Sequence, residues 1–178
     1  MKQTIRSTVS AALLLAAVNP ALTAIAGDDL RMEADRAIRA LTSADSGLTN
    51  FFNGSVGFVV FPSVGKGGLI IGGERGKGVL YEKGKPIGEA TLTEVNVGPQ
   101  AGGQSFYEVI FFETPEALSN FKQSNFEMSA EVSAVAAADG AAANTRYKSG
   151  VTVFTLPRTG LMVQATIGGQ KFKYKPLD

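Results

Sequence analysis

The sequence contains no cysteine, no histidine and no tryptophan among its 178 residues. Without cysteine there is no thiolate nucleophile, no disulfide and no Cys/His zinc site. Without histidine, the usual general acid–base of catalysis near neutral pH is missing as well. The formal net charge of +1 gives no strong field for nucleic acid, which we do not expect as a partner. We therefore expect a binding protein with no catalytic residues, no metal and no cofactor.

The start of the chain has the pattern of a cleaved secretory signal peptide over residues 1–26. Lys2 and Arg6 precede an apolar run over 9–18, which is too short to span a bilayer. Ala-Ile-Ala at 24–26 fits the small-x-small rule of the cleavage site. An uncleaved membrane anchor is the alternative. We expect the mature protein to be exported: periplasmic in a Gram-negative cell and extracellular otherwise.

Residues 27–178 predict one α+β domain, because 44% hydrophobic residues supply a core and no linker interrupts the chain. Apolar residues at helical spacing predict an amphipathic N-terminal helix over about 29–42. Short β-rich runs follow, punctuated by glycine and proline; they lie at 56–61, 69–71, 79–81, 90–97, 106–112, 151–156, 161–166 and 170–174. Their spacing is typical of a twisted antiparallel, barrel-like β-sheet.

Two local signals and one ambiguous stretch complete the prediction of elements. Lys-Gly-Lys-Pro at 83–86 predicts a turn between antiparallel strands. Thr114, followed by Pro115 and Glu116, predicts a helix start. The stretch 128–143 is rich in alanine, serine and valine, and its pattern does not separate helix from strand. We therefore expect one or two helices beyond the N-terminal one.

Six short motifs, taken in order, resemble the SYLF family. They lie at 63–73, 76–80, 97–98, 101–104, 116–121 and 160–162, and the resemblance covers about residues 50–172. It implies a compact, strand-rich α+β domain with a lipid-binding role. Eukaryotic members of that family bind phosphoinositide membranes and some bind actin, whereas an exported bacterial domain would meet other lipids. Many bacterial members carry a lipidated cysteine after the signal, which this chain lacks.

The glycine-rich stretch 72–78 invites comparison with a phosphate-binding loop. Gly72 and Gly76 are separated by three residues where the Walker motif needs four, and Gly78 stands where a Ser or Thr would hold magnesium. A strand, not a helix, is predicted after it. A glycine-rich hairpin therefore fits this stretch better than a phosphate loop or a dinucleotide-binding loop.

Lys66, Arg75 and Lys77 lie on predicted turns and are candidates for contact with anionic lipid headgroups. Lys66 matches the lysine of the SYLF motif. Glu74 and Glu82 interrupt this basic set, so an ordinary solvated set of turns is the alternative.

A second basic group consists of Lys171, Lys173 and Lys175, which alternate along a predicted strand. Alternation places all three on one face. They are further candidates for lipid contact, and the alternative is an edge strand that lysines protect from aggregation. Phe51 and Phe52, between the first helix and the first strand, are candidates for insertion into lipid, with core packing as the alternative.

Catalysis by carboxylates or by a Ser–Lys pair is a further alternative. Glu89, Glu94, Glu108 and Glu113 are the candidates for a glycosidase-like pair. No spacing singles out two of them, and solvent-facing carboxylates on strands are the ordinary interpretation.

Three functions follow, in decreasing order of support. The first is a lipid-binding domain at the envelope membranes, with a phospholipid or fatty acid as ligand and peripheral membrane contact. The second is a structural or protein-interaction domain that docks an envelope protein through a strand edge or the first helix. The third is a hydrolase.

Overall fold

The computed structural model of the chain describes residues 20–65, 76–94, 105–123, 126–129, 131–158 and 169–177. Four helices and eight strands lie within these ranges. In chain order they are α1 (Pro20–Ala44), α2 (Leu48–Gly54), β1 (Gly57–Gly65), β2 (Gly76–Glu82), β3 (Lys85–Glu94), β4 (Ser105–Phe112), α3 (Pro115–Lys122), β5 (Phe126–Glu127), β6 (Ala134–Ala136), α4 (Ala141–Asn144), β7 (Val151–Pro157) and β8 (Lys171–Pro176).

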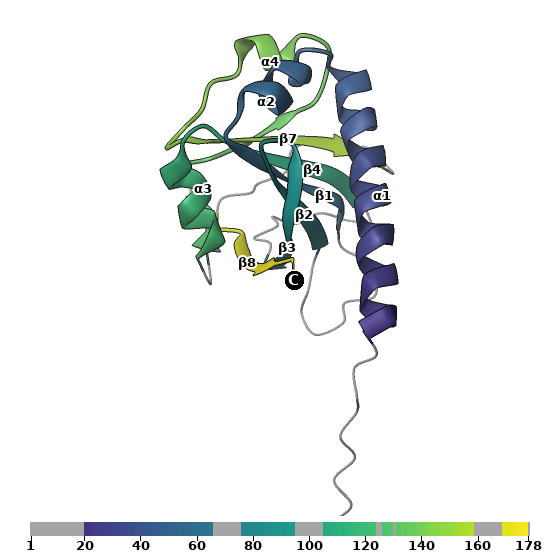
Figure 1. The fold of residues 1–178 in the computed structure, drawn as a ribbon. Helices are drawn as coiled ribbons and strands as arrows, with labels where there is room; N and C mark the ends of the chain where they lie inside the picture. The colour runs from purple at the N-terminus through teal and green to yellow at the C-terminus, as the bar shows by residue number, and fades with distance from the viewer. Residues whose placement is uncertain are drawn as a thin grey trace, which may run out of the picture.

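The strands form one sheet in the order β5-β8-β3-β2-β1-β4-β7-β6. It curls into a half-barrel, with α1 along one side, α3 on the other, and α2 and α4 at the end opposite β8 (Figure 1). The predicted α+β class and barrel-like sheet are confirmed. The sheet is mixed, however, because β6 pairs with β7 in parallel, whereas we predicted antiparallel pairing throughout.

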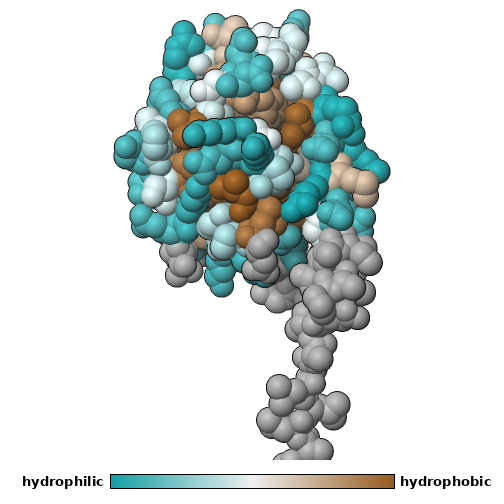
Figure 2. Space-filling view, viewed as in Figure 1, coloured by the Kyte–Doolittle hydropathy of each residue, from teal (hydrophilic) through white to brown (hydrophobic). Residues whose placement is uncertain are grey.

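Helices and loops cover both faces of the sheet, which explains why its central strands are almost continuously apolar. In β1, Val59 and Phe61 point to the face that α3 covers, while Phe58 and Val60 point to the face that α1 and α2 cover. We call these the α3 face and the α1 face. Figure 2 shows hydrophobic residues also reaching the surface in the middle of its view, framed by hydrophilic ones.

Most predicted elements are found, with shifted ends. The N-terminal helix begins at Pro20 and so crosses the predicted cleavage point after residue 26; the cleavage itself stays a prediction. The ambiguous stretch 128–143 contains both β6 and the start of α4. Three helices follow α1, more than the one or two predicted, because α2 and α4 are too short to show a helical period. The predicted strands 69–71 and 161–166 lie outside the described residues.

The two local signals act as predicted. Glu82 pairs with Lys85 across a two-residue turn in which both Lys83 and Gly84 have positive φ, 51° and 73°, the geometry of a type I′ hairpin. Thr114 caps α3: its Oγ1 accepts a hydrogen bond from the Ala117 backbone N–H at 3.2 Å. Over the described ranges, no helix has the length and apolar character that a membrane crossing requires.

Candidate functional site

Three strands bring together basic residues that are almost a hundred positions apart in the sequence. Lys77 on β2 lies opposite Thr91 on β3, and Thr91 lies opposite Lys173 on β8. Neighbouring strands are about 4.8 Å apart, so the Cα atoms of the two lysines are about 10 Å apart. Residues in one cross-strand row share a face of the sheet, and both lysines are exposed there.

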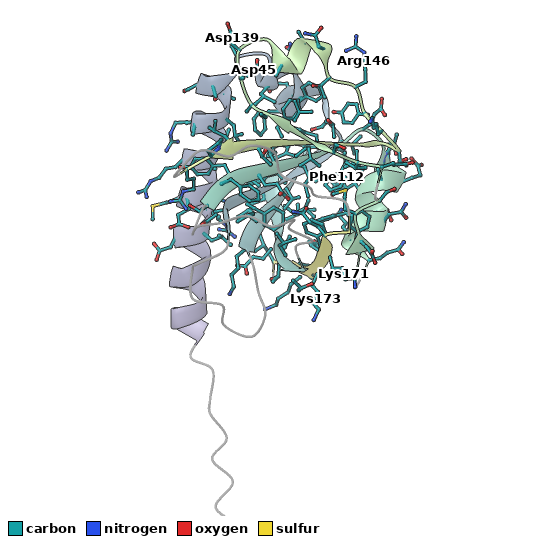
Figure 3. All side chains as sticks on the ribbon, turned by 180° about the vertical axis from the view of Figure 1, so that it is seen from behind. Asp45, Phe112, Asp139, Arg146, Lys171 and Lys173 are labelled. Atoms are coloured by element: carbon teal, nitrogen blue, oxygen red, sulfur yellow. The ribbon has the colours of Figure 1, made fainter. Side chains whose placement is uncertain are left out.

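β8 extends this row into a basic face, which we define as Lys77, Lys171, Lys173 and Lys175. All three lysines of β8 are exposed, whereas Phe172 between them is 1% exposed and packs on the α3 face. The predicted alternation is therefore confirmed. Figure 3 shows Lys171 and Lys173 together at the β8 end of the molecule. Because the apolar residues of β8 pack in the core, this strand holds its lysines on a rigid element.

Three acidic residues lie in register with this basic face. Glu89, which is half-buried, lies opposite Lys175, and Lys171 lies between Glu94 on β3 and Glu127 on β5. Among these seven residues the four lysines outnumber the three acids, so the face is weakly basic. It is a surface that attracts anions, with three acidic residues that limit its strength.

The other predicted lipid contacts lie elsewhere. Lys66 and Arg75 fall outside the described residues. Phe51 and Phe52 belong to α2, at the end of the molecule away from β8 (Figure 1), and their rings are half-buried against an aromatic cluster. The centroid of Phe51 is 5.4 Å from that of Phe111, and the centroid of Phe52 is 4.9 Å from the same ring. The structure therefore does not bring them to the basic face, and their contact with lipid stays a prediction.

The described part of the glycine-rich stretch is a strand. Gly76 and Gly78 lie in β2, which continues into a hairpin with β3 and not into a helix. A side chain at 78 would meet Cδ1 of Phe61 at 2.7 Å. Glycine is therefore needed here for packing, and the helix that a phosphate loop requires does not follow.

Of the four candidate carboxylates, Glu108 is the one that is fully buried. It points into the α3 face, where Nε2 of Gln170 donates a hydrogen bond to its Oε2 at 3.1 Å. Burial raises its pKa from the ordinary 4.5 to about 7, although the hydrogen bond from Gln170 lowers it. Glu89 is half-buried, Glu113 is exposed, and the side chain of Glu94 is outside the described part. Among the described residues, no second carboxyl contributes to the pKa shift of Glu108, so none of them is seen to form a glycosidase pair with it.

Sequence reasoning missed Thr91 and Gln170. Thr91 belongs to the site only because the registers of β2 with β3 and of β3 with β8 place it between two lysines. A strand register cannot be predicted from the local sequence. Gln170 precedes β8 and reaches Glu108 across 62 residues. Within the described ranges, acidic side chains form no group that could hold a metal ion.

The half-barrel and its basic face define a membrane- or protein-interaction domain. Residues 93–175 match the family model of Ysc84, described as Las17-binding protein actin regulator. The resemblance to the SYLF (Ysc84) family that the motifs predicted is thus confirmed over those residues, and that family is one of binding domains.

A curated relative is also similar. Beta cell expansion factor A of Aeromonas veronii is 25% identical to this chain over 158 residues. The match covers 87% of this chain and 59% of that protein, so the chain spans about three-fifths of the length of its relative.

Proposed function

We propose that this chain is an exported lipid-binding domain that acts at envelope membranes, where its basic face contacts anionic headgroups. The observation that carries the proposal is the row Lys77–Thr91–Lys173, which places two lysines from distant parts of the chain on one rigid, exposed surface. An anionic surface attracts each such base by about 1 kcal/mol.

The strength of the basic face sets the mode of binding. Four lysines contribute about 4 kcal/mol at most, which corresponds to a dissociation constant of about 1 mM. Glu89, Glu94 and Glu127 weaken this further. We therefore expect reversible, salt-sensitive attachment, to which apolar surface such as that in Figure 2 adds contact with acyl chains.

Flotation with vesicles tests the proposal. The mature chain should float with phosphatidylcholine vesicles that contain phosphatidylglycerol, less with phosphatidylcholine alone, and less again in high salt because ions screen the attraction. Lys77→Glu with Lys173→Glu should weaken binding about tenfold or more.

The control carries the same charge change elsewhere. Arg36 and Arg39 are exposed on α1, and Arg36→Glu with Arg39→Glu should leave most of the binding intact. Equal flotation of the Lys77/Lys173 variant and the wild type, with both folded, would rule out the basic face as the membrane contact.

The outer edge of β8 supports a protein-interaction function as the second candidate. β5 pairs only with Lys171 and Phe172, so among the described strands the outer edge of β8 beyond Phe172 has no neighbour. Such an edge can accept a strand from another protein. This function predicts that the chain does not bind vesicles and that it pulls down an envelope protein. Lys173→Pro should abolish that pull-down, whereas Lys173→Glu should leave it intact.

A further inference from the structure

A second basic site lies where the segment after α4 meets β6 and β7. The structure has a pocket of about 230 Å³ there, lined by Val132, Ser133, Val135, Asn144, Thr145, Arg146, Lys148, Val151 and Thr152. We call it the α4 pocket. Val132, Val151 and Thr152 of this lining are buried, Val135 and Thr145 are half-buried, and the remaining polar and basic residues are exposed.

Alternation along an extended segment places both cations on the pocket side. Tyr147 points inward, and its ring centroid is 5.5 Å from that of Phe51. Arg146 and Lys148, on either side of it, therefore project the other way. Nη1 of Arg146 donates hydrogen bonds to the carbonyl oxygens of Thr145 at 2.9 Å and Ala143 at 3.3 Å. This holds the guanidinium in place and leaves its other N–H groups available to a ligand.

The charges and hydroxyls of the α4 pocket all suit an anion. Its lining contains two cations and no carboxylate. Among the described residues, neither Arg146 nor Lys148 forms an ion pair. Thr152 is only 4% exposed and also lines the pocket. A threonine hydroxyl that lines a pocket can donate a hydrogen bond to an oxygen of a ligand.

We infer that the α4 pocket binds a phosphate group, with Arg146 and Lys148 holding its charge and Thr152 donating to one of its oxygens. Arginine pairs with phosphate through two parallel N–H···O bonds, and such charged hydrogen bonds are about twice as strong as neutral ones. The volume decides the size of the ligand: about 230 Å³ holds several waters but is smaller than the roughly 300–1,000 Å³ of a site for a drug-sized molecule. The pocket therefore fits a phosphate or glycerol phosphate group and excludes an acyl chain.

The α4 pocket is separate from the basic face. Figure 3 shows Arg146 at one end of the molecule and Lys171 and Lys173 at the opposite end. Substitutions at one site therefore leave the other intact, and the inference stands or falls independently of the proposed membrane contact.

Amide chemical shifts of the ¹⁵N-labelled mature chain test the inference with three probes: inorganic phosphate, glycerol 1-phosphate and dihexanoyl phosphatidylglycerol. Saturable shifts at 145–148 and at Thr152 are expected with at least one probe. Binding of inorganic phosphate would identify a free anion as sufficient, and binding of the short-chain lipid alone would identify a lipid headgroup as the source of the phosphate.

Variants decide whether the named residues make the site. Arg146→Ala with Lys148→Ala should weaken binding by about tenfold or more, and the isosteric Thr152→Val should weaken it less. Lys83→Ala with Lys85→Ala, which removes the same charge from the exposed hairpin, is the matched control. If loss of the Arg146 contacts unfolds α4, the affinities of the single variants Lys148→Ala and Thr152→Val for the same probes replace that measurement. No saturable shift with any probe, or unchanged affinity in the variants, would overturn the inference.

Discussion

Gln170 donates a hydrogen bond from Nε2 to Oε2 of Glu108 inside the apolar α3 face of the sheet. Oε1 of Glu108 and Oε1 of Gln170 have no partner among the described residues. Two unpaired acceptor oxygens in such a place are costly, and a proton on Glu108 turns one of them into a donor. The neutral acid is therefore the form that this environment favours.

The pH dependence of stability should carry the signature of Glu108. Burial raises its pKa from 4.5 to about 7, so the folded state holds a proton that the unfolded state has released. This stabilisation is complete below pH 4.5 and is lost as the pH rises through 7. Relative to Glu108→Gln, the wild type should lose about 3 kcal/mol of unfolding free energy between pH 4.5 and pH 8. Urea titrations of both proteins measure this difference, and a difference that does not change with pH would contradict the buried acid.

Asp45 should hold two helices in place. It is 2% exposed; its Oδ1 accepts from the Gly47 N–H at 2.9 Å and its Oδ2 from the Ala142 N–H at 2.6 Å. Asp45→Ala removes both charged hydrogen bonds and should lower the free energy of unfolding by about 3 kcal/mol. Chemical denaturation measures the loss. Asp139→Ala, at an exposed position near the same end of the molecule, should change it by less than about 0.5 kcal/mol, and equal effects would contradict the role of Asp45.

Gly78 should resist substitution for a packing reason. A Cβ there would be 2.7 Å from both Cδ1 of Phe61 and the Val60 carbonyl oxygen. Gly78→Ala should therefore destabilise the protein by about 1–3 kcal/mol. At Gly54, a Cβ meets nothing within 4 Å, so Gly54→Ala should be neutral or slightly stabilising. Thermal unfolding of the two variants makes the comparison, and a stable Gly78→Ala protein would show that β2 moves to make room.

Thr114 should contribute through its cap of α3 alone. Thr114→Ala removes the acceptor for the Ala117 N–H and should cost about 1 kcal/mol, whereas Thr114→Ser keeps the hydroxyl and should cost much less. Calorimetry of the three proteins tests this order. If serine fails to restore stability, the side chain acts through packing and not through the cap.

Local chemistry made much of the fold predictable. Apolar, β-branched runs mark β1, β4 and β7 because these strands are buried on both faces, and Thr114-Pro115-Glu116 marks α3 because caps are read from a few residues. The order of the strands was not predictable. Thr93 donates to the Lys171 carbonyl across 78 residues, and no local pattern specifies such a partner.

The basic face and the α4 pocket likewise contain features that the local sequence predicts and features that it does not. Outward alternation of Lys171 and Lys173 is a property of one strand and was predictable. The proximity of Lys77 depends on two registers, and the α4 pocket depends on β6, whose alanines and valine fit helix and strand equally well. Asp45 followed by Gly47 is a turn signal. The hydrogen bond that Asp45 accepts from the Ala142 N–H spans 97 residues, and the local sequence does not predict it.

The position of β8 in the sheet affects how the nascent polypeptide folds. β3 takes β8 as its partner, and the ring of Phe172 covers Phe61 from a centroid distance of 5.6 Å. Until residues 171–176 emerge from the ribosome or from a translocation channel, the backbone of β3 is an open template and Phe61 lacks that cover. Long-range pairing of this kind is slow and exposes the chain to aggregation. A chaperone that holds unfolded clients would therefore be needed most during the interval before the final strand arrives.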